Sequence, residues 1–401
     1  MPPISKKGKI LFVGSAFPPS PGGSMVVMRE LLRNFAPESY VIIAPRYYGC
    51  GKGCEKSSAI FRVGASKLWP SRFAAWLRLL QVPFLLKSAV GYARKHNVIA
   101  IVAPYPSLDM LLLALLVAKR LNLPIFPYLH DTIVEALEKT SLRQVARFVQ
   151  RRVFAVARKI MVMSDGMAAL YKTKYNLDCV PIRHTYREII RETANECDER
   201  SLFCAGNIYG VNDKALVRVM QVASRLGLKT EIATLSDSVR EYVLKLRSEG
   251  LLVEAVGYND RPAYLEAVAS HGINVLALND AKDSDWGDEE LATAFPTKTA
   301  EYLASGRPIL VICPERYFLS KYFKKHACGK VLPPSCSDAE IESAIQQLLS
   351  NGHDVQEMCK NAIVRAHDFA SEKIAKAFAE TIEMNLPAHG DDNVSDVGST
   401  I

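Results

Sequence analysis

The chain has 401 residues, of which 49% are apolar and 23% charged, as is usual for globular proteins. This composition excludes a disordered, collagen-like or coiled-coil chain, and the length predicts two or three domains. The longest apolar run, 110–118, is too short to cross a bilayer, and residues 1–9 lack the features of a secretory signal. We therefore expect a cytoplasmic protein that is at most peripheral on the inner face of a membrane.

The positive charge is concentrated in the first half of the chain. Residues 1–195 contain 29 Lys and Arg against 11 Asp and Glu, whereas residues 196–401 contain 21 against 31. Such an asymmetry indicates an anionic partner for the first half. No nucleic-acid-binding motif accompanies the charge, so we expect no nucleic acid and favour an anionic membrane surface. A solvated basic face and an anionic soluble substrate are the alternatives.

Two segments combine cations with apolar side chains, as helices that lie at a membrane surface do. The first, 69–80, mixes tryptophans with arginines, and in the second, 143–157, arginines and valines each recur every four residues. The residues that we expect to face the membrane are Trp69, Arg72, Trp76, Arg78, Arg143, Arg147 and Arg151. The alternative for the second segment is an amphipathic surface helix with a solvated basic stripe.

Short apolar runs alternate with helical patterns, and the runs have the length and composition of parallel strands buried on both faces. They lie at 9–13, 40–44, 98–103, 125–129 and 160–163 and, after a polar stretch at 191–201, at 202–205, 229–233, 252–256, 273–278 and 309–313. The alternation predicts an α/β fold with two tandem Rossmann-like domains, each a doubly wound parallel sheet, facing a ligand-binding cleft. The expected units are an N-terminal domain at 1–192, a second domain at 193–365, a helix at 366–386 that packs back toward the N-terminal domain, and a disordered tail at 387–401.

The most informative segment is 294–311, whose pattern predicts a loop, a short helix, a glycine stop and a buried strand. Thr297 or Thr299 can cap the helix, whose free amides could hold a phosphate, and Lys298 could offset the phosphate charge. Glu301 lies in the first turns, where its carboxylate can accept hydrogen bonds from the two adjacent hydroxyls of a ribose. The alternative is an ordinary helix with a glutamate favoured by the helix dipole.

The run Phe-Pro-Thr-Lys-x-x-Glu-Tyr-Leu-Ala-Ser-Gly-Arg-Pro at 295–308 resembles the donor-binding signature of glycosyltransferases with the GT-B fold, most closely retaining glycosyltransferase family 4. Further matching features follow in order along 9–380, namely Gly22-Gly23, His130-Asp131, Ser164-Asp165, Gly206-Asn207 and Val256-Gly257-Tyr258. The resemblance implies transfer of a hexose-type sugar from a nucleotide-sugar to a glycan, lipid-linked or polysaccharide acceptor, with retention and without a metal or other cofactor. The C-terminal domain would hold the nucleotide and the N-terminal domain the acceptor.

The resemblance also implies roles for individual residues. Glu301 matches the glutamate that binds the donor ribose, and 297–299 match the diphosphate-binding turn. The expected donor-binding residues are Gly22, Gly23, Gly206, Asn207, Tyr258, Thr297, Lys298, Thr299 and Glu301. The catalytic candidates are His130, Asp131, Lys214 and Lys298. His130 matches a histidine near the transferred sugar, and the alternative is a core histidine at the end of a strand.

Two positions depart from the family pattern. The family commonly has a further glutamate eight positions before the one that matches Glu301, and here that position is Thr293. Glu289 and Glu290 lie nearby but out of register with it. Gly206 is followed by Asn207, where many members have arginine.

These departures leave two alternatives to a retaining transferase. One is a non-catalytic, membrane-docked subunit with the same fold. The other is a nucleotide-sugar epimerase or an inverting transferase in which His130 or Asp131 is the base. Hard cations favour carboxylates such as those of the acidic run 280–290, but we expect this run to be a solvated loop and not a metal site.

Overall fold

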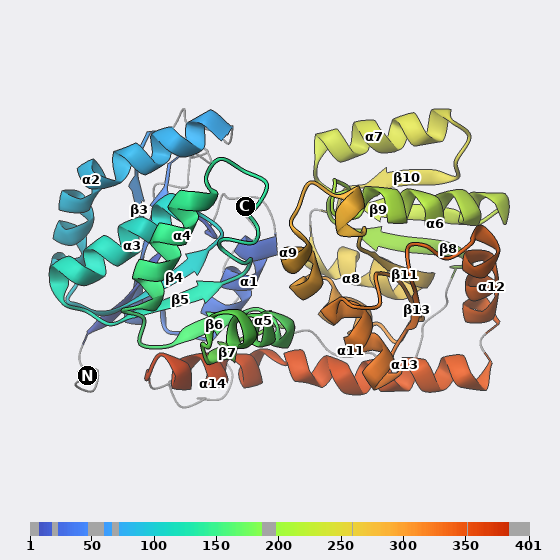
Figure 1. Cartoon of the computed structure of the whole chain (residues 1–401). Helices are drawn as coiled ribbons and strands as arrows, with labels where there is room; N and C mark the ends of the chain where they lie inside the picture. The colour runs from blue at the N-terminus through green and yellow to red at the C-terminus, as the bar shows by residue number, and fades with distance from the viewer. Residues whose placement is uncertain are drawn as a thin grey trace.

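The computed structural model describes residues 8–17, 23–46, 60–65, 72–186, 198–258, 260–350 and 352–384. The N-terminal lobe (Figure 1) is built on a seven-stranded parallel sheet in the order β3-β2-β1-β4-β5-β6-β7. Its strands are β1 (Lys9–Val13), β2 (Tyr40–Pro45), β3 (Ile60–Val63), β4 (Val98–Tyr105), β5 (Ile125–Leu129), β6 (Ile160–Val162) and β7 (Cys179–Pro181). The central strands β4 and β5 are almost completely buried, because helices cover both faces of the sheet.

The helices of this lobe are α1 (Gly23–Leu32), η1 (Pro37–Ser39), α2 (Arg72–Lys95), α3 (Leu108–Leu121), α4 (Arg143–Phe154) and α5 (Asp165–Tyr175). Local signals set their ends. Asn122 ends α3 in the left-handed conformation two residues before Pro124, and the chain then enters β5. Ser164 caps α5 by accepting a hydrogen bond from the backbone N–H of Met167 at 3.0 Å.

The C-terminal lobe has a six-stranded parallel sheet in the order β10-β9-β8-β11-β12-β13. Its strands are β8 (Asp198–Ala205), β9 (Lys229–Ala233), β10 (Val253–Val256), β11 (His271–Ala277), β12 (Ile309–Ile312) and β13 (Lys330–Leu332). Its helices are α6 (Asp213–Arg225), α7 (Asp237–Ser248), α8 (Arg261–Ser270), η3 (Ala281–Asp283), α9 (Asp288–Thr293), α10 (Thr299–Ala304), α11 (Phe318–His326), α12 (Asp338–Leu349) and α13 (His353–Ala366).

In each sheet the chain first adds strands on one side of the first strand and then on the other side. The switch points lie between β1 and β4 in the first sheet and between β8 and β11 in the second. Ligands of doubly wound sheets bind beyond the carboxyl ends of the strands at such switch points. The predicted α/β fold with two tandem doubly wound parallel sheets is confirmed. The strands β3, β7 and β13 were not predicted, because they are short and only partly buried.

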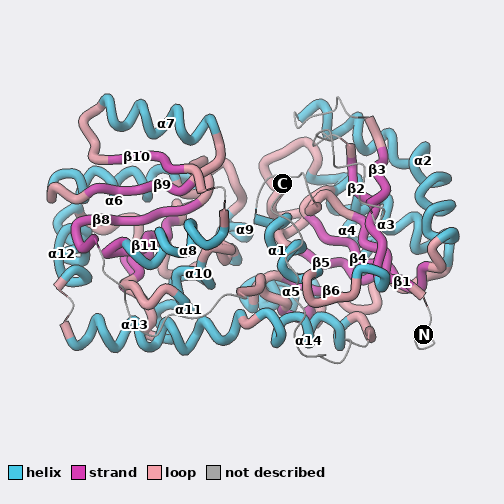
Figure 2. Tube along the Cα trace, turned by 180° about the vertical axis from the view of Figure 1, so that it is seen from behind, coloured by secondary structure: helices cyan, strands magenta, loops and turns pink. Residues whose placement is uncertain are grey.

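The chain crosses between the lobes twice, and the two crossings are hydrogen-bonded to each other. The backbone N–H of Tyr186 donates to the Phe369 carbonyl at 2.6 Å, and that of Ser371 donates to the Tyr186 carbonyl at 3.0 Å. After η4 (His367–Phe369), helix α14 (Ser371–Thr381) packs on the N-terminal lobe, with the Phe378 ring stacked on Phe12. Figure 2 shows α13 and α14 along one edge of both lobes. The tail at 387–401 and most of the predicted linker at 191–201 lie outside the described residues.

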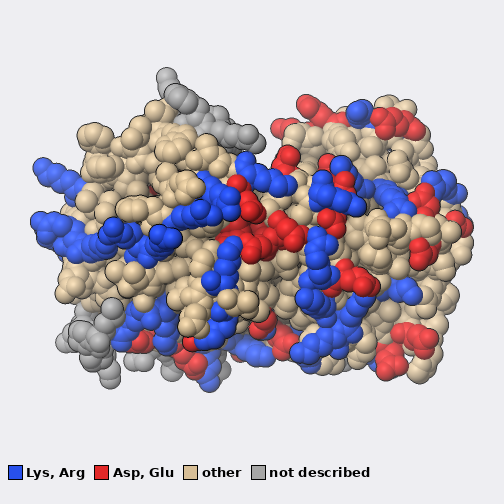
Figure 3. Space-filling model, viewed as in Figure 1, with Lys and Arg blue, Asp and Glu red and all other residues tan. Residues whose placement is uncertain are grey.

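Charged side chains are unevenly distributed over the face shown in Figure 3. Basic side chains form a band across the N-terminal lobe, and acidic side chains gather where the two lobes meet. Within the described ranges, no helix has both the length and the hydropathy that crossing a bilayer would require.

Candidate functional site

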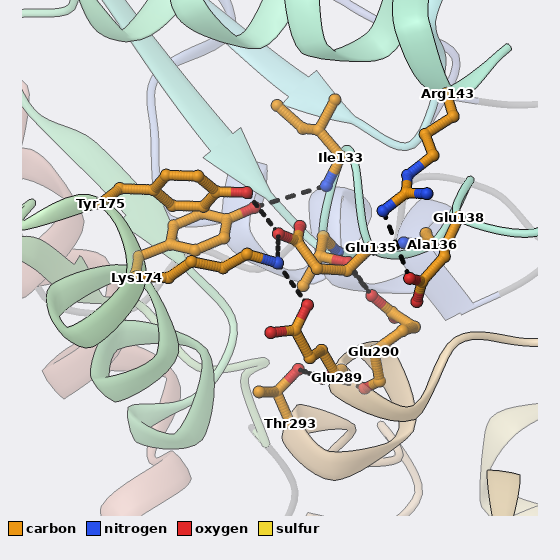
Figure 4. Close-up of polar contacts among 12 residues, drawn as sticks. Ile133, Glu135, Ala136, Glu138, Arg143, Lys174, Tyr175, Glu289, Glu290 and Thr293 are labelled. Carbon is orange, nitrogen blue, oxygen red and sulfur yellow. Dashed lines mark hydrogen bonds and ion pairs between the residues drawn. The ribbon is translucent and has the colours of Figure 1, made fainter.

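Polar contacts between the loop after β5, helix α5 and helix α9 join the two lobes (Figure 4). Glu290 of α9 is 4% exposed and accepts hydrogen bonds from the backbone N–H of Thr132, at 2.8 Å, and from the Thr132 hydroxyl. Lys174 of α5 contacts Glu135 at 2.9 Å and Glu289 of α9. We name these five residues the interdomain clasp, because Glu289 and Glu290 belong to the C-terminal lobe and the other three to the N-terminal lobe.

Thr293 stands where the resembled family has its first glutamate, and it also lies at the junction. Its hydroxyl donates to backbone carbonyls of its own helix, to Glu290 at 3.1 Å and to Glu289 at 3.2 Å. Its carbonyl accepts a hydrogen bond from the Ser164 hydroxyl at 2.9 Å. Thr293 therefore stabilises the junction, and the carboxylates that α9 directs to the opposite lobe come from Glu289 and Glu290.

Asp131, a catalytic candidate, adjoins the clasp and is electrostatically coupled to Glu290. Burial raises the pKa of both carboxyls, and the charge of Asp131 raises the pKa of Glu290 further. The junction therefore brings one carboxyl from each lobe close enough for the charge of Asp131 to act on Glu290.

His130 lies at the carboxyl end of β5, with its ring 4.4 Å from that of Tyr128. Both ring nitrogens are buried, and neither has a hydrogen-bond partner among the described residues. Burial lowers the pKa of His130 to about 3, so the ring is neutral near pH 7. A neutral imidazole can donate one hydrogen bond to a ligand and accept one, but it is a poor general acid.

Lys298 directs its ammonium to the end of the first strand of the C-terminal lobe, where it donates to the Ala205 carbonyl at 2.5 Å. Gly206 follows with φ +94°, a conformation that residues with a Cβ rarely adopt, and a Cβ there would meet nothing within 4 Å. The neighbouring Thr299 hydroxyl is buried and has no partner in the described part of the chain. A cation and open space beside Gly206 thus lie at one end of β8.

The N-terminal lobe approaches this segment at Gly23, the first residue of α1. A Cβ at Gly23 would lie 3.0 Å from the Thr297 hydroxyl oxygen, so a larger residue would press the lobes apart. The structure thus brings Gly23, Thr297, Lys298 and Gly206 to the junction, whereas Gly22 lies outside the described residues. Asn207 is exposed beside Gly206.

Glu301 is engaged by helix α8, which sequence reasoning did not connect with it. Arg261 and the Tyr264 hydroxyl each donate to its carboxylate at 2.5 Å. Asp260 fixes the start of α8 by accepting the backbone N–H of Ala263 at 2.8 Å. Tyr258 lies nearby but donates to Glu231. The Asp-Arg-Pro start of α8 predicts a helix, but no local pattern shows that Arg261 reaches a residue 40 positions away.

Lys214, another catalytic candidate, belongs to the first turn of α6, the helix that follows β8. It is exposed at the start of α6 and pairs with Asp283 at 2.9 Å. Arg316 similarly joins Asp280 at 3.0 Å to Asp288 at 2.7 Å. Most acidic side chains of this run are thus at least partly exposed, as expected, but the run is not a plain loop, because it contains η3 and the start of α9 and because Glu290 is buried. Among the residues that the structure describes, no group of three or more His, Cys, Asp or Glu is arranged to hold a metal ion.

The residues expected to face a membrane have different environments. Trp69 and the side chain of Arg72 lie outside the described parts, and Trp76 is exposed. Arg78 is directed inward, 3.8 Å from Asp109.

On α4, Arg147 and Arg151 are exposed, while Arg143 contacts Glu138 at 3.4 Å. The apolar stripe of the same helix packs into the core through Val149 and Val153. That stripe cannot also enter a membrane, which corrects the interfacial interpretation of this helix.

No protein-family model and no curated protein matches this sequence. Solved structures match in fold. HepE (Alr3699) of Anabaena, in complex with UDP, is 14% identical, with 94% of this chain and 99% of HepE covered and a TM-score of 0.68. A glycosyltransferase of Rickettsia africae is 13% identical over 94% and 100% of the two chains, with a TM-score of 0.63. MurG of Acinetobacter baumannii is 11% identical over 94% and 99%, with a TM-score of 0.54.

The chain therefore has the GT-B fold of glycosyltransferases, as the resemblance implied. At these identities the likeness concerns the fold. Assignment to family 4 stays a prediction, and so do the roles of the individual site residues.

Proposed function

We propose that this protein transfers a sugar from a nucleotide-sugar donor to a glycan or lipid-linked acceptor. The observation that carries the proposal lies at the end of β8, where the Lys298 ammonium donates to the Ala205 carbonyl and the next residue, Gly206, has open space where a side chain would stand. A fixed cation beside open space suits a diphosphate, whose negative charge grows as the sugar leaves. Gly23 brings the opposite lobe to the same place.

Glu301 is the proposed ribose ligand. Its carboxylate accepts hydrogen bonds from Arg261 and Tyr264, and the two ribose hydroxyls would replace one or both of these donors. Arg261 would then supply positive charge at the donor site, a function that Asn207 cannot perform. The structures of HepE and of a rice protein, Os79, were solved with UDP, so uridine diphosphate is the first donor to test.

His130 and Asp131, on the N-terminal side of the junction, are proposed to face the transferred sugar and the acceptor. The unpartnered ring nitrogens of His130 can bond to sugar hydroxyls. In the retaining reaction that we favour, the acceptor attacks from the face that the diphosphate leaves, and the departing phosphate oxygen takes the proton of the acceptor hydroxyl. We propose no metal in this step, which transfer in the presence of EDTA would test.

The position of Asp131, next to His130 just after β5, favours a second candidate, an inverting transferase. Asp131 in its charged form would accept the proton of the acceptor hydroxyl while the acceptor attacks from the opposite face of the sugar. The anomeric configuration of the product, measured by proton NMR, separates the two reactions. Retention supports the first candidate, and inversion supports the second.

Nucleotide binding is tested by thermal shift with UDP, GDP, ADP and CMP and their sugars. We expect one nucleotide to stabilise the wild type, and we expect Glu301→Gln and Lys298→Ala to reduce the shift. The controls are Glu357→Gln and Lys360→Ala on α13, where both side chains are exposed. No shift with any nucleotide, or equal shifts in all variants, would contradict the proposed donor site.

A further inference from the structure

Helix α2 carries an apolar ridge on its outer face. Trp76, Leu80 and Phe84 are 39%, 66% and 83% exposed, and their spacing of four residues places them along one side of the helix. Apolar side chains that are contiguous on a surface usually mark a contact with a protein or a membrane. The exposed ridge therefore indicates a contact with a molecule other than the described residues of this chain.

The charge around the ridge is positive. Helix α2 contains no Asp or Glu along its 24 residues, and beyond the ridge it exposes Lys87, Arg94 and Lys95. Helix α4 also lacks acidic residues and exposes Arg147, Phe148, Arg151 and Arg152, with the Arg152 guanidinium 5.0 Å from the centre of the Phe148 ring.

The two helices form one side of the N-terminal lobe, with α3 between them. The Trp76 indole N–H donates to the Ser141 hydroxyl at 3.4 Å, which joins the start of α2 to the segment that leads into α4. In Figure 3 a band of basic side chains crosses this lobe, and the area above the band, over α2, has few charges. An apolar ridge thus lies beside a cationic band, an arrangement typical of surfaces that bind anionic bilayers.

We propose that this α2–α4 surface, formed by the ridge Trp76, Leu80 and Phe84 and the cations Lys87, Arg147, Arg151 and Arg152, docks the protein on a membrane of anionic lipids. The ridge enters the interface while the cations meet the lipid phosphates. Docking goes beyond the proposed transfer reaction and does not depend on donor binding. Two copies of the chain do not pair through this surface, because α2 and α4 contain no acidic residue and both expose cations, so that two such faces repel.

A groove at the inner side of α4 provides room for a lipid headgroup. It has a volume of about 510 Å³, and its wall includes Arg143, Arg147 and Arg151 together with the apolar Phe154 and Leu177. Lys174 of the interdomain clasp also lines it. A phosphate held there would lie near the junction where we place the transfer reaction.

Co-sedimentation of the full chain with vesicles tests the proposal. One vesicle set is phosphatidylcholine alone, and the other adds phosphatidylglycerol. We expect binding to the anionic set at low salt, loss of binding as salt rises, and little binding to the neutral set. Leu80→Ser/Phe84→Ser and Arg147→Gln/Arg151→Gln/Arg152→Gln should each weaken binding about tenfold or more.

Matched controls lie on α7 of the other lobe. Leu244→Ser removes an exposed leucine, and Arg240→Gln/Lys245→Gln/Arg247→Gln removes three cations. We expect both to bind like the wild type. Absence of wild-type binding, equal binding to neutral vesicles, or equal losses in the α7 controls would overturn the proposal. Nucleotide thermal shifts of the same variants should stay unchanged, so a failure of docking is distinguishable from a failure of the donor site.

Discussion

Glu290→Gln tests whether the clasp carboxyl is held in its protonated form. Burial and then the charge of Asp131 raise the pKa of Glu290 above the value of about 4.3 that glutamate has in an unfolded chain. The folded protein therefore binds this proton more tightly than the unfolded chain does. Glutamine has the shape of protonated glutamate, and its carbonyl oxygen can accept both hydrogen bonds from Thr132.

The sign of the pH effect follows from the raised pKa. The stability that such a group contributes is fully present below the unfolded pKa, and it is lost as pH rises through the folded pKa. Each unit by which the pKa is raised corresponds to about 1.4 kcal/mol of unfolding free energy lost over that window. Glutamine has no proton to lose. As pH rises through this window, we therefore expect the unfolding free energy of Glu290→Gln to fall less than that of the wild type. The difference should be about 1.4 kcal/mol for each unit by which the fold raises the pKa of Glu290.

Urea unfolding at about pH 4, 6, 7 and 9 measures this difference. Glu357→Gln is the control, because Glu357 is exposed on α13, and its profile should parallel that of the wild type. If the profile of Glu290→Gln runs parallel to that of the wild type, with or without a constant difference in stability, burial does not hold a proton on Glu290 and the reasoning is refuted.

Two further predictions concern packing and backbone conformation. Phe378→Ala removes a fully buried ring that stacks on Phe12, and it should lower the free energy of unfolding by about 3–5 kcal/mol and release α14. Limited proteolysis should then cut near residue 371 sooner than in the wild type. An unchanged rate of cleavage would contradict this prediction. Gly206→Ala should lower the free energy of unfolding by about 1–2 kcal/mol, because alanine is strained at φ +94° although the space is open. Gly91→Ala, in helix α2 with equally open space, is its control and should stabilise by about 0.5–1 kcal/mol, so a similar change in both variants would refute the strain argument.

The fold was predictable because its signal is local. Strands covered on both faces need continuous apolar runs, and each run alternates with a helical pattern, as at β4, α3 and β5. Segments of three or four partly exposed residues such as β7 and β13 carry too little of this signal. The segment 295–308 indicated a donor site through its own residues, and Lys298 does reach the end of β8.

What surrounds each of those residues was decided by the tertiary structure. Glu301 meets Arg261 and Tyr264, and Glu290 meets Thr132, 158 positions away, because packed elements bring distant segments together. The sequence of α4 by itself shows an apolar and a cationic stripe, but the docking of the helix on the core uses the apolar one. The sequence alone thus determined the fold class, since periodicity and capping act within a few residues, and its resemblance to a known signature pointed to the segment 295–308. Only the tertiary structure decided which carboxyls are buried, which cations pair with them and which apolar face remains exposed, since these depend on contacts between segments far apart in the chain.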